Sequence, residues 1–378
     1  MRVMGINRPL PESILLFLGV ALLPVYAFGS GGVQPAHAVL ALFAGVVLIR
    51  NGIPMPYWAQ FLFATCVYVL FVESFYAIKE SSSSQLINVV YYFYNFFLCV
   101  SVFSFFRRGG GPPIAVGSIA AVFLVLGSYL LISDGTGVRF TATFNNPNQL
   151  GYFSVCLVSI FYLLYRIGSF NYLFAIALIG VAYFLSILSL SKAAMVANFV
   201  VAIFVLKPAF GGCRMTALWV VGILSVLGSL YWLYASGDMS DYRFVGRLEG
   251  MVAENDSSLE ARGYLAFLEG GFAQNLFGLG SAKAVELVGH EVHSTLGSIF
   301  TYYGLFGLLL FSGALVIWAR TLWQGFGLIG LISLAGPVML YGLTHNGTRF
   351  ATFWILFGAS IAAARTRINC GWNKQDLK

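Results

Sequence analysis

The sequence predicts an all-α fold, a polytopic membrane protein with about twelve transmembrane helices and one larger hydrophilic segment. Of its 378 residues, 59% are hydrophobic and 9% are charged, whereas soluble domains carry about 25% charged residues. The mean hydropathy is +0.84. The apolar stretches are continuous and do not alternate with polar residues, which favours helices over the strands of an outer-membrane barrel.

Each predicted helix is an apolar run close to the roughly 20 residues that cross a bilayer. The runs cover residues 13–30, 33–49, 57–78, 86–106, 113–133, 149–165, 169–189, 193–206, 215–235, 294–318, 323–344 and 350–364. No convincing small-residue cleavage site follows the first run, so we expect a retained helix and not a signal peptide. The run 193–206 is short, which indicates a tilted or partly re-entrant helix. Together the runs form one integral membrane domain, 1–378.

Lysine and arginine counts set the orientation. With the N-terminus inside, 13 of the 21 Lys and Arg residues lie on the inner side and 8 on the outer side, as the positive-inside rule favours. An even number of helices then places both termini in the cytoplasm and the longest hydrophilic segment, 236–293, outside. The net charge of +7 therefore reports orientation and does not indicate nucleic acid. Five cysteines without a CxxC pair suggest neither zinc nor a redox pair.

Basic residues on the outer side oppose the insertion rule, which suggests that a function requires them. Scattered surface charge beside acids such as Glu249, Glu254 and Glu260 is the alternative explanation. Because the basic residues come from four separate outer segments, we expect them to converge on a cationic pocket for an anion. They are Arg139, Lys192, Arg243, Arg247, Arg262 and Arg349.

The stretch RFTATFNNPNQLG, from Arg139 to Gly151, is a polar island between two apolar runs. Proline suits the first position of a helix, so Asn146 is the predicted N-cap and Gln149, three residues later, completes a capping-box-like pattern. The N-terminus of that helix faces outside, where its free N–H groups and dipole favour a phosphate. Capping explains Asn146 and Gln149 but not Asn145, Asn148 and Arg139 together, which favours a binding function for the stretch.

Two ionisable residues lie within or between apolar runs. Lys192, in LSLSKAAM, sits at a tight turn near the outer face; snorkelling is the simple explanation, and lining an outer cavity is the functional one. Glu73 is an acid within an apolar run near its outer end. It is a candidate functional group by default, and it is equally a candidate counter-ion for a nearby Arg or Lys.

The histidines of VGHEVHSTLG do not form a metal motif. His290 and His293 are three residues apart, whereas the zinc motif HExxH places its histidines four apart, so no metal site is expected. A neutral imidazole at His293 suits a general base near pH 7 or a hydrogen bond to a leaving group. An interfacial polar residue without catalytic function is the alternative.

Four motifs in this order resemble the bacterial O-antigen ligase/polymerase superfamily. The family pattern TGTFxNPNxLG is similar to TATFNNPNQLG here, and LTxSRxA is similar to LSLSKAA, where Lys192 takes the place of the family arginine. The outer-loop pattern SxxxR followed by PxxGxG fits Arg262 and Gly278–Gly280, without the proline. The pattern HNxxLxxxxxxGxxGL fits His293, with serine in place of the asparagine. The resemblance covers Arg139 to Leu310.

The resemblance implies a GT-C-like, metal-independent, inverting membrane glycosyltransferase that needs no cofactor. It implies a donor glycan on undecaprenyl pyrophosphate at the periplasmic face of the bacterial inner membrane. The acceptor is lipid A core for a ligase or a second lipid-linked repeat for a polymerase of O-antigen or exopolysaccharide, and a protein Ser or Thr in a related variant. By this resemblance Arg262 and His293 are catalytic. The substrate-binding residues expected from the resemblance and from the outer charges are Lys192, Arg139, Asn146, Asn148, Arg247, Arg349 and Glu73.

Two other functions are compatible with the composition. A transporter or flippase of a lipid-linked or anionic solute would carry polar residues down to the midplane of several helices, whereas here the outer halves hold nearly all of them. A non-catalytic partner in envelope assembly would have no cleft that joins Lys192, Arg262 and His293.

Overall fold

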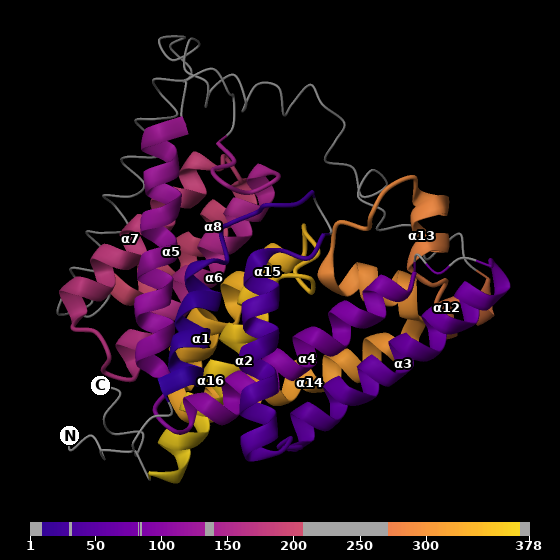
Figure 1. Ribbon diagram of the computed structural model, residues 1–378, viewed down its shortest axis with the longest axis horizontal. Coiled ribbons are helices and arrows are strands. Elements are labelled where there is room, and N and C mark those ends of the chain that lie inside the picture. Colours follow the sequence, from indigo (N-terminus) through magenta and orange to yellow (C-terminus); the bar gives the residue numbers. More distant parts are fainter. Residues whose placement is uncertain are drawn as a thin grey trace.

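The structure is a computed structural model that describes residues 10–29, 32–81, 83, 85–132, 140–206 and 271–370. These residues form helices and connecting loops, with no strand among them, as the composition predicts (Figure 1). The helices are α1 (Leu10–Ala21), α2 (Pro35–Asn51), α3 (Tyr57–Lys79), α4 (Leu86–Phe106), α5 (Gly111–Ile132), α6 (Pro147–Arg166), α7 (Tyr172–Leu188), α8 (Lys192–Leu206), α12 (Phe272–Phe277), α13 (Ser281–Val288), α14 (Thr295–Leu334), α15 (Gly336–Gly342) and α16 (Ala351–Asn369).

Five of these helical stretches are long and apolar enough to cross a membrane: α3, α4, α5, α6 and the stretch of α14 with α15. The shorter apolar helices α1, α2, α7 and α8 have 12, 17, 17 and 15 residues. The chain is thus all-helical in its described part, with helices suited to a membrane, while twelve crossings and an outer segment at 236–293 stay predictions. The predicted run 215–235 lies outside the described residues.

Two helices form the centre of the bundle. Every residue of α6 from Leu150 to Leu164 is buried, and so is every residue of α16 from Ala351 to Ala364. Helix α16 packs against α4, α14 and α6, and α6 packs against α7 and α8. Both helices carry buried small and polar residues, such as Ser154, Ser159 and Ser360, which suit close packing between helices better than contact with lipid.

Four helices run in the same direction between two different ends of the bundle. Helices α2, α4, α6 and α16 begin at one end, and an arginine or an arginine-rich turn closes each at the other end. The second end carries Arg50, Arg107, Arg108, Arg166, Arg365 and Arg367 and is called the arginine end below. Helix α6 has 20 residues, which at ~1.5 Å per residue span ~30 Å, about the thickness of a bilayer core.

Helix α14 differs most from the prediction of two spans, 294–318 and 323–344. Its 40 residues are separate helical segments with breaks at Gly304 and Gly327, whose φ angles are 64° and 72°, so the second break lies at Gly327 and not at the predicted 319–322. Only glycine adopts that region without cost. The break frees the carbonyls of the first segment, and those of Thr301 and Tyr302 accept hydrogen bonds from the backbone N–H groups of Leu279 and Gly280 at 3.2 and 2.9 Å.

Candidate functional site

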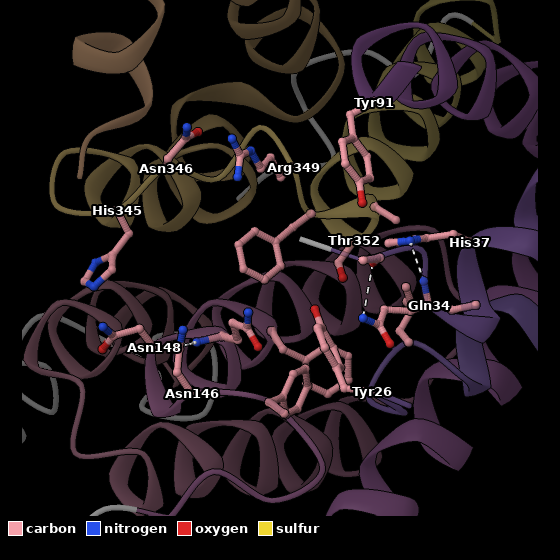
Figure 2. A pocket seen from close by; sticks show the side chains of 18 of the residues that line it. Tyr26, Gln34, His37, Tyr91, Asn146, Asn148, His345, Asn346, Arg349 and Thr352 are labelled. Atoms are coloured by element: carbon pink, nitrogen blue, oxygen red, sulfur yellow. Dashed lines mark hydrogen bonds between the residues drawn. The ribbon is translucent and has the colours of Figure 1, made fainter. Parts of the chain in front are cut away.

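A cavity of about 260 Å³ lies at the end of the bundle opposite the arginine end, called the cavity end below. Figure 2 shows Asn146 and Asn148 on one side of it and Asn346 and Arg349 across from them. Its other polar lining residues are Gln34, His37, Gln149, Glu291, His293, His345 and Thr352, and its aromatic lining residues are Tyr26, Tyr91, Phe144, Phe153, Tyr341 and Phe350. The cavity therefore has groups for an anion, for proton transfer and for an apolar or ring-shaped ligand.

The N-terminal ends of four helices meet at the cavity. The cavity is lined by residues in the first turns of α2, α6, α14 and α16 or directly before them, among them His37, Asn148, His293 and Thr352. The N-terminus of a helix carries about half a positive charge and unpaired N–H groups. Four such ends around one space favour an anionic ligand, in addition to any charged side chain.

The predicted cap at Asn146 is confirmed. Its side chain accepts a hydrogen bond from the backbone N–H of Gln149 at 3.0 Å, and the Gln149 side chain accepts one from the backbone N–H of Asn145 at 3.1 Å. The amide of Asn145 donates to the carbonyl of Phe28 at 3.1 Å, and the Thr143 hydroxyl bonds to the carbonyl of Pro24. The polar island thus joins α6 to the loop between α1 and α2.

Asn148, which capping does not explain, lines the cavity. Its backbone carbonyl accepts a hydrogen bond from the Tyr341 hydroxyl at 2.7 Å, and the Tyr341 ring stacks on His345 with centroids 4.5 Å apart. Figure 2 shows His345 at the Asn148 end of the cavity. Helix α15 therefore positions both the backbone at Asn148 and an imidazole.

Arg349 carries the charge on the opposite wall. Its Nη1 lies 2.7 Å from Glu291 Oε1, and its Nη2 donates to Asn88 Oδ1 at 3.2 Å. Burial disfavours the charged guanidinium, but Glu291 outweighs burial through its charge and its hydrogen bond and raises the pKa of Arg349. Arg349 is therefore a permanent cation whose present partner, Glu291, also lines the cavity.

The backbone around Arg349 is held by hydrogen bonds from two helices, α14 and α4. Thr295 of α14 donates to the carbonyl of His345 at 3.1 Å and accepts from the N–H of Gly347 at 2.9 Å. Asn95 of α4 donates to the carbonyl of Thr348 at 3.1 Å. A Cβ at Gly347 would lie 2.3 Å from the Tyr152 hydroxyl of α6, so the segment passes too close to α6 for a side chain.

Three of the four histidines surround the cavity, and the fourth stacks on one of them. His290 and His293 stack with centroids 5.3 Å apart and planes 10° apart, and His293 lies 6.5 Å from His345. Ser294 caps α14 by accepting a hydrogen bond from the N–H of Gly297. This cap fixes the backbone next to His293, which lies just before the helix. Within the described part of the chain, no group of three His, Cys, Asp or Glu is arranged to hold a metal.

Sequence reasoning missed the contribution of the α1–α2 loop. Gln34 is buried, and its oxygen accepts from the N–H groups of Ala27 and Phe28 at 3.0 and 3.1 Å. His37 Nδ1 accepts from the Gln34 N–H at 3.1 Å, so a neutral His37 carries its proton on Nε2. The sequence does carry a local signal for these two residues: Gln34-Pro35-Ala36-His37 starts α2 with a proline in its first turn and a capping-box pattern, as Asn146 to Gln149 do for α6.

The other predicted residues lie in different places. Lys192 is exposed at the first position of α8 and does not line the cavity. A Cβ at Gly151 would lie 2.9 Å from Ser191, so the LSLSKAA turn does pack against the first turns of α6. Arg139, Arg243, Arg247 and Arg262 lie outside the described residues.

Glu73 is fully buried and does not line the cavity. It accepts hydrogen bonds from the Ser281 N–H, at 3.3 Å to each carboxylate oxygen, and from the Tyr303 hydroxyl at 2.9 Å. It thereby caps α13 at its N-terminus, where a carboxylate is favoured. Asn88, which bonds to Arg349, donates to the Ser281 hydroxyl at 2.6 Å, so Glu73 is connected to the cavity through two residues.

Comparison with known proteins adds no information about this site. No protein-family model matches the chain, and no curated protein matches it.

Proposed function

We propose that the chain is a membrane glycosyltransferase that moves a glycan from undecaprenyl pyrophosphate to a saccharide acceptor. The observation that carries the proposal is the single cavity that Asn146, Asn148, His293 and Arg349 share at the cavity end. The arginine end would be cytoplasmic by the positive-inside rule. The cavity would then open at the periplasmic face of a bacterial inner membrane, with both termini in the cytoplasm.

The proposed step is a displacement with inversion. The acceptor hydroxyl oxygen bonds to the anomeric carbon, and the bond from that carbon to the pyrophosphate oxygen breaks. Its electron pair leaves with the lipid pyrophosphate, which gains one negative charge, and the hydroxyl proton passes to the imidazole of His293. The products are a new glycoside, undecaprenyl pyrophosphate and an imidazolium that releases its proton to water.

Positive groups would stabilise the pyrophosphate as it leaves. Arg349 and the four helix N-termini supply such groups within the described residues. By the family resemblance, Arg262, Lys192 and Arg139 would add to them, in a mechanism that needs no metal. Arg247 would contribute as one of the predicted outer cations. The aromatic residues would contact the lipid or the apolar face of a sugar ring, and the acceptor would be lipid A core or a second lipid-linked repeat of O-antigen or exopolysaccharide.

The packing below the cavity disfavours transport of a lipid-linked or anionic solute. From Leu150 to Leu164 in α6 and from Ala351 to Ala364 in α16 every residue is buried. Most of these side chains are apolar and pack into the core between the cavity and the arginine end. A transporter needs polar groups at this depth.

Transfer by purified protein tests the proposal. The full chain in detergent is incubated with an undecaprenyl-pyrophosphate glycan and an acceptor, with and without EDTA. We expect His293→Ala and Arg262→Ala each to lower the rate by about 10²-fold or more, and Arg320→Gln, an exposed arginine of α14 outside the cavity, to leave it unchanged. Robust transfer by both first variants would overturn the site, and complete inhibition by EDTA would overturn the metal-free step.

A further inference from the structure

One end of the cavity, called the neutral end below, is lined by polar side chains without charged groups among them. These residues are Tyr26, Gln34, His37, Tyr91 and Thr352. Figure 2 shows them together at the side away from His345. The whole cavity measures about 260 Å³, much more than the roughly 30 Å³ of one water in the liquid, so it has room for an organic ligand.

His37 presents a proton to the neutral end. Its Nδ1 accepts a hydrogen bond from the backbone N–H of Gln34 at 3.1 Å, so the ring is neutral and carries its proton on Nε2. The ring also meets the rings of Tyr91 and Tyr94 edge-on, with centroids 6.1 and 5.5 Å apart. No residue in the described part of the chain accepts the Nε2 proton. His37 therefore has a hydrogen bond to donate to a ligand.

Gln34 positions this donor and is itself fully used inside the protein. It is 3% exposed, and its Oε1 accepts from the N–H groups of Ala27 and Phe28 at 3.0 and 3.1 Å. Its Nε2 donates to the carbonyls of Phe28 and Gly32 at 3.0 and 3.2 Å. These bonds fix the loop between α1 and α2, and with it the backbone N–H that orients His37.

Thr352 and Tyr26 add two hydroxyl groups without a protein partner. Thr352 is 3% exposed, yet its hydroxyl forms no hydrogen bond with any described residue, and Figure 2 shows this side chain directed into the cavity. The Tyr26 hydroxyl likewise has no hydrogen-bond partner among the described residues. Since buried polar groups are normally hydrogen-bonded, three such groups around one space indicate a polar ligand.

We propose that the neutral end binds an uncharged sugar unit through Tyr26, His37 and Thr352. A hydroxyl both donates and accepts, so two hydroxyls and one N–H match the several oxygens of a sugar without requiring a charge on it. The rings of Phe144 and Phe153 line the cavity as well and suit the apolar face of a sugar ring, because ligand sites combine apolar walls with a few polar groups. Sugar binding rests on this lining alone, whereas identity as the sugar bonded to the pyrophosphate rests on the proposed function.

Ligand-observed NMR tests the neutral end without any transfer assay. The full chain in nanodiscs is mixed with glucose, galactose, N-acetylglucosamine and rhamnose, and saturation transfer to each sugar is measured. His37→Phe and Thr352→Val each remove one hydrogen-bonding group and keep a side chain of similar size, so each should weaken binding of at least one sugar by about threefold to tenfold. Thr366→Val is the matched control, because Thr366 is exposed on the same helix as Thr352 and does not line the cavity.

Calorimetry with inorganic pyrophosphate on the same samples separates the sugar site from the proposed function. We expect Thr352→Val to leave pyrophosphate binding unchanged. The sugar site is overturned if no sugar binds, if His37→Phe and Thr352→Val both bind sugars like wild type, if Thr366→Val loses as much affinity as Thr352→Val, or if both cavity variants weaken pyrophosphate binding as strongly as sugar binding. Sugar binding that depends on Thr352, without pyrophosphate binding, would sink the proposed function and keep the sugar site.

Discussion

The cavity end and the arginine end of the bundle hold their arginines for different reasons. At the arginine end, Arg50, Arg166 and Arg367 lie in the last turns of α2, α6 and α16, where the helix dipole favours a cation. Arg349 lies among the N-termini of the same helices, where the dipole disfavours a cation. It therefore needs a negative partner, and Glu291 is the one that the described residues supply.

The partners of the arginines differ in the same way. Arg50 lies 2.7 Å from Glu12, which is almost fully buried, and Arg107 and Arg365 lie over the Phe103 ring at 5.5 and 5.7 Å. These contacts hold α1, α2, α4 and α16 together. Arg349 and Glu291 form a half-exposed pair on the wall of a cavity. Surface pairs of this kind add little stability, which points to binding as the use of Arg349.

The largest expected effect comes from replacing one arginine at each end. The variant at the cavity end should lose pyrophosphate affinity, and the variant at the arginine end should lose stability. Arg349→Gln removes a charged donor from the cavity, so we expect the affinity for inorganic pyrophosphate to fall by about 10–100-fold. Arg50→Gln leaves the buried Glu12 without its cation and should lower the free energy of unfolding by about 1–3 kcal/mol. Calorimetry and thermal unfolding of both variants measure the two quantities.

The comparison fails if the two variants behave alike. Weaker pyrophosphate binding in Arg50→Gln would mean that the arginine end also contributes to the anion site. Unchanged pyrophosphate binding in Arg349→Gln would mean that Arg349 does not belong to the proposed anion site.

The core between the two ends should tolerate no added volume where α16 meets α4. A Cβ at Gly358 would lie 2.4 Å from the backbone oxygen of Cys99, and this atom cannot move without the helix. We expect Gly358→Ala to lower the free energy of unfolding by about 1–3 kcal/mol. Gly45 of α2 is the control, because a Cβ there meets nothing within 4 Å, and Gly45→Ala should raise stability by up to about 1 kcal/mol.

Thermal unfolding in one detergent measures the pair of glycine variants. A Gly358→Ala variant as stable as wild type would show that α4 and α16 are less closely packed than the short approach indicates. Unchanged pyrophosphate binding in both variants is expected, since neither glycine lines the cavity.

Local chemistry made part of this molecule predictable. The run 86–106 coincides with α4, because apolar content and the flanking loops are properties of the segment itself. The cap at Asn146 follows from a proline and a glutamine within three residues of it. The two breaks in α14 did not follow, because Gly304 bends the helix where the Gly278 segment approaches from another element: a Cβ at Gly304 would lie 2.6 Å from the Gly278 backbone nitrogen.

Some residues of the site were predictable from the sequence, and others were not. Asn146, Asn148, His293 and Arg349 were candidates from the sequence, and the structure brings all four to one cavity. Gln34, His37 and His345 were missed although the contacts that place them lie within seven positions in sequence, because none of the three belongs to a catalytic or binding motif. For Glu73 the sequence left a binding role and a structural role open, and its partners Ser281 and Tyr303 lie more than two hundred positions away.

Two asparagine caps offer the smallest and most closely matched comparison of the two ends. Asn146 caps α6 at the cavity end, and Asn171 caps α7 near the arginine end by accepting from the Phe174 N–H at 2.8 Å. Replacing either residue by alanine removes one cap, so we expect each variant to lose about 1 kcal/mol of stability. Asn146→Ala also removes an amide from the cavity, and its affinity for pyrophosphate should fall by about threefold to tenfold.

The two variants have the same chemical change and the same expected loss of stability. Any difference in their pyrophosphate affinities therefore comes from where the asparagine lies. Thermal unfolding checks that the losses match, and calorimetry with pyrophosphate then compares the affinities. Equal affinities would mean that Asn146 acts only as a cap, and that the anion is held by Arg349 and other groups. A selective loss in Asn146→Ala would mean that the polar stretch around it contributes to the site directly, in addition to starting α6.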